Sequence, residues 1–177
     1  MLGYIFWHWP DDPAADREAY EAAQRAFHRA LAATRSEGFI RSLSFRVQGL
    51  PWLGAPEGKA YEDWYLLEGS YALDPLNELA VSASVRDAHA GAANGATGAG
   101  ALYRLARGVP EWGSGEVAWV AKPRGEHYAG FYARFPDEGV VWRRQMVLGP
   151  ATEFVAEGAP PDGLEALRVR RELFIET

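Results

Sequence analysis

The 177-residue chain contains no cysteine, which excludes disulfide bonds and thiolate metal sites. No two histidines are spaced four residues apart and no His-Glu motif of a zinc site occurs, so the sequence predicts no metal centre. Lys and Arg number 18 against 24 acidic residues, and no basic stripe stands out. Binding to nucleic acid is therefore not expected, because phosphate contacts need clustered Lys and Arg.

Long hydrophobic runs are also missing. The apolar start Leu2–Trp9 lacks a basic flank, and it is too short for a signal peptide or a membrane span. These features predict a cytoplasmic protein with no membrane partner. A hydrophobic fraction of 48% and an aromatic fraction of 13% are typical of a globular chain.

Two stretches of the chain share one pattern. Trp64–Leu79 and Phe154–Leu167 each contain an apolar run, then Glu-Gly, then a short segment with leucines three residues apart. This pattern is typical of a strand, a turn and the start of a helix. The chain is therefore expected to contain two related halves.

The first half, residues 1–108, predicts the order β-α-β-β-α-β. Gly3–Trp9 is an aromatic run that predicts a buried strand, and Asp12 followed by Pro13 predicts a helix start. Phe39–Gln48 alternates, with Leu43, Phe45 and Val47 on one face, and predicts a half-polar strand. The other expected elements are a first helix ending near Thr34, a strand at Tyr61–Leu67, a helix from Leu73 through His89, the end of that helix plus a glycine-rich loop over Gly91–Gly100, and a strand at Ala101–Ala106.

Residues 109–115 predict a linker, and the order restarts over residues 116–177. Val117–Pro123 parallels the first strand, and Met146–Pro150 parallels Arg46–Pro51. The other expected elements are a helix at Glu126–Phe135, a strand at Glu153–Ala156, a helix at Asp162–Ala166 and a strand at Leu167–Ile175.

Two such units in tandem predict an α+β fold of two ferredoxin-like units. Each sheet has helices on one side, so its bare face needs cover, which the other sheet can supply. On these paired motifs the chain resembles the dimeric α/β barrel superfamily in its tandem-repeat form. The resemblance implies antiparallel sheets that face each other as an α/β barrel, with a site between sheet and helices or between the sheets. The superfamily includes haem-binding proteins, cofactor-free monooxygenases, lyases and isomerases, and the fold does not choose among them.

His8 is the first candidate catalytic residue. It lies between Trp7 and Trp9 in an aromatic strand, where a buried imidazole needs a polar partner. It is interpreted as a general base in a ligand pocket with Trp7 and Trp9; the alternative is a core histidine bonded to a backbone carbonyl or a carboxylate. Arg46 and Arg143, on predicted strands, would bind an anionic ligand if they face inward and would be solvated otherwise.

The other histidines receive different interpretations. In haem-binding relatives an axial histidine comes from a helix of the C-terminal half, so the resemblance makes His127 the candidate haem ligand. His28 is interpreted as a boundary residue of the first helix, and His89 as a surface residue.

Three functions follow as hypotheses, and the sequence leaves open whether the protein is an enzyme. The first is a protein that binds a small aromatic or hydrophobic molecule, or a cofactor-free enzyme of the oxygenase or lyase type with His8 as its base. The second is a haem-binding protein that uses His127. The third is a non-catalytic module whose apolar faces form a homodimer or larger oligomer.

Overall fold

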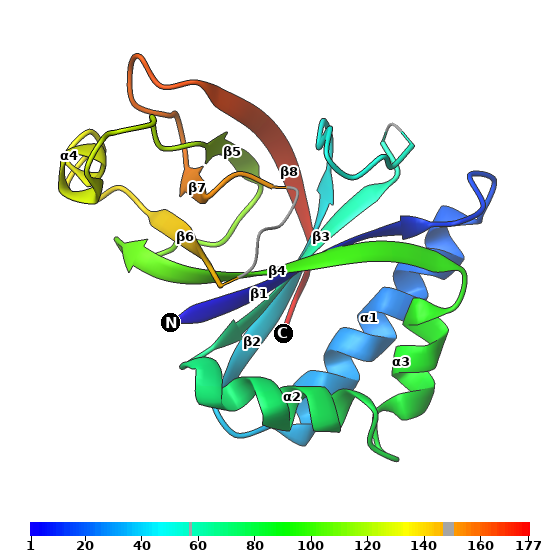
Figure 1. Ribbon diagram of the computed structural model, residues 1–177. Coiled ribbons are helices and arrows are strands. Elements are labelled where there is room, and N and C mark those ends of the chain that lie inside the picture. Colours follow the sequence, from blue (N-terminus) through cyan, green and yellow to red (C-terminus); the bar gives the residue numbers. More distant parts are fainter. Residues whose placement is uncertain (57, 147–150) are drawn as a thin grey trace.

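The computed structural model describes residues 1–56, 58–146 and 151–177, and its eight described strands form one closed antiparallel barrel (Figure 1). The strands are β1 (Leu2–Pro10), β2 (Phe39–Val47), β3 (Ala60–Leu67), β4 (Ala96–Arg107), β5 (Gly115–Val120), β6 (Val141–Gln145), β7 (Phe154–Glu157) and β8 (Ala166–Glu176). The helices are α1 (Arg17–Thr34), the short 3-10 helix η1 (Ser70–Ala72), α2 (Leu73–Ala80), α3 (Arg86–Ala93) and α4 (Tyr128–Tyr132).

Both halves place their strands in the ferredoxin-like order. The first half runs β4-β1-β3-β2 and the second half runs β8-β5-β7-β6. The pairings β2–β8 and β4–β6 then join the two sheets at both margins. The predicted α+β fold, with antiparallel sheets facing each other as a barrel, is confirmed. Because the sheet closes on itself, the described strands leave no open sheet edge.

Side-chain alternation divides the strands of the first half between two environments. Ile5 and Trp7 of β1 belong to the core inside the barrel, as do Leu43, Phe45 and Val47 of β2. The predicted alternation of β2 is therefore confirmed. Tyr4, Phe6 and His8 face outward, toward the helices. Every residue of β3 is buried, because helices cover its outer face.

Helices α1, α2 and α3 lie together over one side of the barrel, while α4 lies against the other half (Figure 1). The prediction that α1 begins after Asp12 was wrong. The side chain of Asp16 caps α1 by accepting from the Glu18 amide at 3.0 Å, and Asp12 caps a separate turn by accepting from the Ala14 amide at 2.8 Å. An aspartate side chain can cap a turn as well as a helix, so the cap at Asp12 alone did not identify where α1 begins.

Three other predictions are corrected. The helix expected from Leu73 through His89 is two helices, α2 and α3, separated by turns. The helix expected at Glu126–Phe135 is only the five-residue α4, and residues 162–166 form turns and the start of β8 instead of a helix. The parallel drawn at Met146–Pro150 lies, after Met146, outside the described residues.

Residues 91–100, expected to hold the end of a helix and then a loop, contain the end of α3, a turn at residues 94–95 and, in place of a longer loop, the start of β4. A Cβ on Gly100 would lie 2.7 Å from the Tyr4 hydroxyl, and one on Gly98 would lie 2.7 Å from the backbone oxygen of Trp7. Glycine is therefore required because the rings of β1 lie flat against β4. Close packing, and not turn formation, explains these glycines.

The barrel interior is filled by tryptophans around one buried ion pair. Trp7 and Trp64 each donate an indole N–H to the Glu62 carboxylate at 2.8 Å, and Arg171 lies 3.8 Å from the same carboxylate. Arg171 also stacks on Phe45, with its guanidinium carbon 4.5 Å from the ring centroid. Burial raises the pKa of Glu62, against the opposing effect of Arg171. Among the described helices, none is long and apolar enough to cross a membrane.

Candidate functional site

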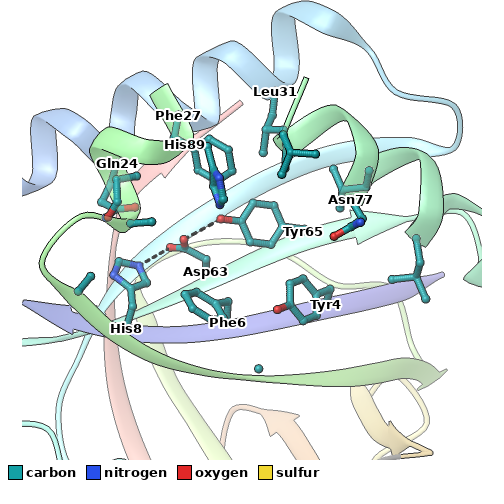
Figure 2. Close-up of a pocket in the computed structure, with 18 of the residues that line it drawn as sticks. Tyr4, Phe6, His8, Gln24, Phe27, Leu31, Asp63, Tyr65, Asn77 and His89 are labelled. Carbon is teal, nitrogen blue, oxygen red and sulfur yellow. Dashed lines mark hydrogen bonds and ion pairs between the residues drawn. The ribbon is translucent and has the colours of Figure 1, made fainter. Parts of the chain in front are cut away.

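A cavity of about 650 Å³ lies between the outer face of the first sheet and its helices. The sheet supplies β1, β3 and β4, and α1, α2 and α3 form the opposite wall (Figure 2). Most of the lining is apolar, with a polar group at one end. The lining includes Tyr4, Phe6, His8, Gln24, Phe27, Asp63, Tyr65, Asn77, Ala80 and His89.

Asp63 of β3 is the centre of the polar end. Its carboxylate is 1% exposed and accepts hydrogen bonds from the Tyr65 hydroxyl at 2.9 Å, from His28 Nε2 at 3.2 Å and from the Ser44 hydroxyl. A buried carboxylate with this many donors is satisfied as an anion. Strand geometry explains the arrangement, since Asp63 and Tyr65 lie two residues apart on the outer face of β3.

His8 occupies the wall of the cavity beside this carboxylate. Its Nε2 lies 3.3 Å from Asp63 Oδ1, as the dashed contact in Figure 2 shows, but Nε2 takes part in no directed hydrogen bond. Its Nδ1 lies 2.6 Å from the Tyr20 hydroxyl, in hydrogen-bond contact. His8 is therefore held from both sides of its ring, while Nε2 keeps capacity for a further partner.

His28 supports Asp63 from the helix side. It is fully buried on α1, and its Nδ1 lies 2.7 Å from the Ser42 hydroxyl. Because Asp63 only accepts, His28 Nε2 carries the proton in that contact. The two imidazoles thus approach different oxygens of one carboxylate, His8 at Oδ1 and His28 at Oδ2.

Burial and the contacts around Asp63 determine which groups at the polar end are ionised. Burial alone would raise the pKa of Asp63, but His8 and His28 together outweigh burial and hold that pKa below its usual range. Burial, reinforced by the negative charge of Asp63, raises the pKa of Tyr65 and of Tyr20. At neutral pH the site therefore combines an ionised carboxylate with neutral phenols.

Aromatic rings continue from the polar end along the sheet. Phe6 and His8 stack with centroids 5.9 Å apart, and Tyr4 stacks on Tyr65 at 5.9 Å. On the helix side, the ring of His89 lies 5.0 Å from that of Phe27. A flat apolar molecule could contact rings on both walls while a polar substituent meets His8.

The donor atoms of this cluster do not converge as metal ligands would. His8 and His28 flank Asp63 on opposite oxygens, and no group of three or more ligating side chains able to hold a metal ion occurs within residues 1–56, 58–146 and 151–177. The cluster is organised by hydrogen bonds to one carboxylate.

The surroundings of His127 do not fit a haem. His127 is exposed at the residue before α4, on the half of the barrel away from the cavity (Figure 1). Beneath α4, the rings of Phe131 and Phe154 pack with centroids 4.5 Å apart, and Phe135 packs on Phe131 at 5.2 Å. Packed aromatic rings therefore occupy the space between α4 and β7.

The structure separates the other residues that the sequence grouped with His8. Trp7 and Trp9 lie on the opposite face of β1 and pack inside the barrel, because neighbouring residues of a strand alternate. Arg46 is paired with Glu21 at 2.7 Å and 2.8 Å and with Glu172 at 2.6 Å.

Arg143 is similarly engaged away from the cavity. It donates to the Tyr128 hydroxyl at 2.7 Å and to Glu153 at 3.1 Å, and it stacks over the Tyr128 ring at 3.9 Å. Arg46 and Arg143 therefore contact protein groups and do not line the cavity of the first half.

Sequence reasoning missed Asp63, and it misjudged two histidines. His28 is fully buried and not a boundary residue, and His89 is half-buried against the cavity and not a surface residue. One signal was available: Glu62 and Asp63 are adjacent acids inside an otherwise apolar strand. A second was the buried face of α1, where Gln24 and His28 share a helical stripe with Phe27.

Comparisons with known proteins add little. No family model matches the chain, and no curated protein matches it. A crystal structure of a protein described as a "putative chlorite dismutase" aligns over 98% of this chain and 94% of that chain, with a TM-score of 0.48 and 12% identity. At this distance the similarity carries no argument about ligand, reaction or cofactor.

Proposed function

We propose that the protein binds a small, flat, largely aromatic or hydrophobic molecule in the helix-covered cavity and exchanges a proton with it through His8. The observation that carries this proposal is a buried polar centre, His8 beside the ionised Asp63, at one end of an otherwise apolar cavity of about 650 Å³. A core histidine bonded only for packing would not need an adjoining cavity of this size. Cavities lined by apolar groups with a few convergent polar groups are typical ligand sites.

The chemistry that fits the site is general base catalysis. A ligand O–H or C–H bond breaks, its proton passes to His8 Nε2, and the electron pair stays on the ligand. Asp63, 3.3 Å away, stabilises the imidazolium that forms, and the imidazole is held by Tyr20 on its other side. Proton removal of this kind begins both cofactor-free oxygenation and lyase-type elimination, which are the reaction types we propose.

Binding can be tested with 2-naphthol and naphthalene as paired probes, because they differ only in the hydroxyl group. We expect 2-naphthol to bind one molecule per chain in calorimetric titration. His8→Asn should weaken 2-naphthol binding by about tenfold, the equivalent of one charge-assisted hydrogen bond, and should leave naphthalene binding unchanged.

A second pair of variants tests the location. Ala80 of α2 lines the cavity, so Ala80→Trp should fill it and abolish binding of both probes. Ala129 is exposed on α4 and outside the cavity, so Ala129→Trp is the matched control and should bind normally. Binding that survives Ala80→Trp, or no binding of either probe to the folded wild type, would contradict the proposal.

A further inference from the structure

A second, smaller hollow lies beside Tyr20, which is in contact with His8. It has a volume of about 360 Å³, lies beside the start of α1, and is lined by Tyr20 together with Asp11, Asp12 and Asp16. All three aspartates are exposed, while Tyr20 is half-buried. The hollow is therefore a solvated, acidic region, and Tyr20 forms part of its lining.

Tyr20 connects this hollow to His8. The Tyr20 hydroxyl lies 2.6 Å from His8 Nδ1, and which group donates depends on the tautomer of His8. The other ring nitrogen, Nε2, belongs to the polar end of the large cavity beside Asp63. One nitrogen of His8 thus contacts Tyr20, which lines the hollow, and the other lies beside Asp63, which lines the cavity.

We propose that Tyr20 is the proton port of the cavity, passing protons between His8 and the solvent of the acidic hollow. The role rests on the proposed function of His8, since a buried base that accepts a ligand proton must lose it again before the next turnover. In the tautomer with its proton on Nδ1, His8 gains the ligand proton at Nε2, Nδ1 passes its own proton to the Tyr20 oxygen, and the Tyr20 hydroxyl proton passes to water in the hollow. When Nε2 then gives its proton to the product or the leaving group, the same path runs backward and returns a proton to Nδ1, which restores the base. Each step breaks one bond to hydrogen and forms another, so the ligand and the proton use separate openings.

Tyr61 provides a matched comparison. Its ring stacks directly on His8, with centroids 5.3 Å apart and an interplanar angle of 10°. Its hydroxyl instead donates to Glu21 at 3.2 Å and makes no contact with a His8 nitrogen. Removing either hydroxyl leaves an aromatic ring against His8, but only Tyr20→Phe removes the proton path.

The test measures the solvent exchange rate of the His8 ring N–H by ¹⁵N-resolved NMR in the ligand-free protein. We expect Tyr20→Phe to slow this exchange by about tenfold or more, because only local opening remains as a route, and Tyr61→Phe to change it by less than about twofold. The backbone amide of Asp63 reports local opening in the same spectra. A purely structural role for Tyr20 would speed the exchange of both groups.

An exchange rate in Tyr20→Phe that equals or exceeds the wild-type rate would overturn the proposal, as would equal slowing in Tyr61→Phe. The measurement needs no ligand, so its outcome is independent of the naphthol titrations. Slowed exchange without naphthol binding would retain the port and remove the proposed function. Naphthol binding together with unchanged His8 exchange in Tyr20→Phe would retain the proposed function and contradict the proton port.

Discussion

Replacing Asp63 with asparagine removes one negative charge while keeping the size of the side chain. The carboxylate accepts from Tyr65, His28 and Ser44 and faces His8 Nε2. An asparagine has one oxygen and an NH₂ group, which cannot accept a hydrogen bond. At least one side of the cluster therefore loses its acceptor, and the cluster loses its negative charge.

The expected cost is large. Removing one partner of a buried charged pair costs about 3–5 kcal/mol, because the remaining groups stay buried without compensation. Folded domains have a total free energy of unfolding of about 5–15 kcal/mol, so this single atom exchange would remove a major share. We therefore expect Asp63→Asn to lower the free energy of unfolding by about 3–5 kcal/mol.

Urea unfolding followed by tryptophan fluorescence and circular dichroism measures this free energy. Asp137→Asn is the control, since Asp137 pairs with Arg107 at 2.8 Å but its side chain is 97% exposed. Exposed pairs contribute about 0–1 kcal/mol, so the control should be nearly neutral. A loss below about 1 kcal/mol in Asp63→Asn, with an unchanged denaturant slope, would refute the view that one carboxylate organises the site.

Two further outcomes are expected. Hydrogen bonds from Arg46 lower the pKa of Glu21 from 4.5 to about 2, so this carboxylate stabilises the fold above pH 4.5 and loses its effect as pH falls toward 2. Glu21→Gln should therefore flatten the acid side of a stability–pH curve measured by circular dichroism, and an unchanged acid limb would contradict that assignment. When haemin is added, the wild type and His127→Ala should give the same absorption spectrum in the Soret region, because phenylalanine rings pack beneath α4. A Soret-type band that is present in the wild type and absent in His127→Ala would instead support haem binding at His127.

The sequence carried the fold in its local patterns. Alternation at Leu43, Phe45 and Val47 identified a strand with one face in the core, and the repeated Glu-Gly turns indicated two related halves. The closure of the barrel had no such local signal. It depends on β2 pairing with β8, strands separated by more than half of the chain, and no local pattern records a partner at that distance.

The site was predictable only in part, for a related reason. His8 was identified because it is polar within an aromatic strand. Its partners in the structure come from β3 and α1. The face of β1 on which His8 lies depends on which face points into the barrel, and the sequence of β1 alone does not specify this. Trp7 and Trp9 are adjacent to His8 in the chain yet lie across the sheet from it, whereas Asp63 is 55 residues away and lies 3.3 Å from its ring. Proximity along a strand was thus a poor guide to proximity in the site.

The adjacent acids of β3 have a consequence for how the chain folds. Glu62 points into the barrel toward two indoles and Arg171, while Asp63 points out toward two imidazoles. A slip of β3 by one residue would exchange these surroundings and would also turn Trp64 out of the barrel. Glu62 would leave its indole donors and Arg171, and Asp63 would leave the donors that satisfy it now; a buried carboxylate that loses its partners costs several kcal/mol. The two neighbouring charges therefore specify the register of the central strand, and they make mispaired barrels unfavourable before any ligand is involved.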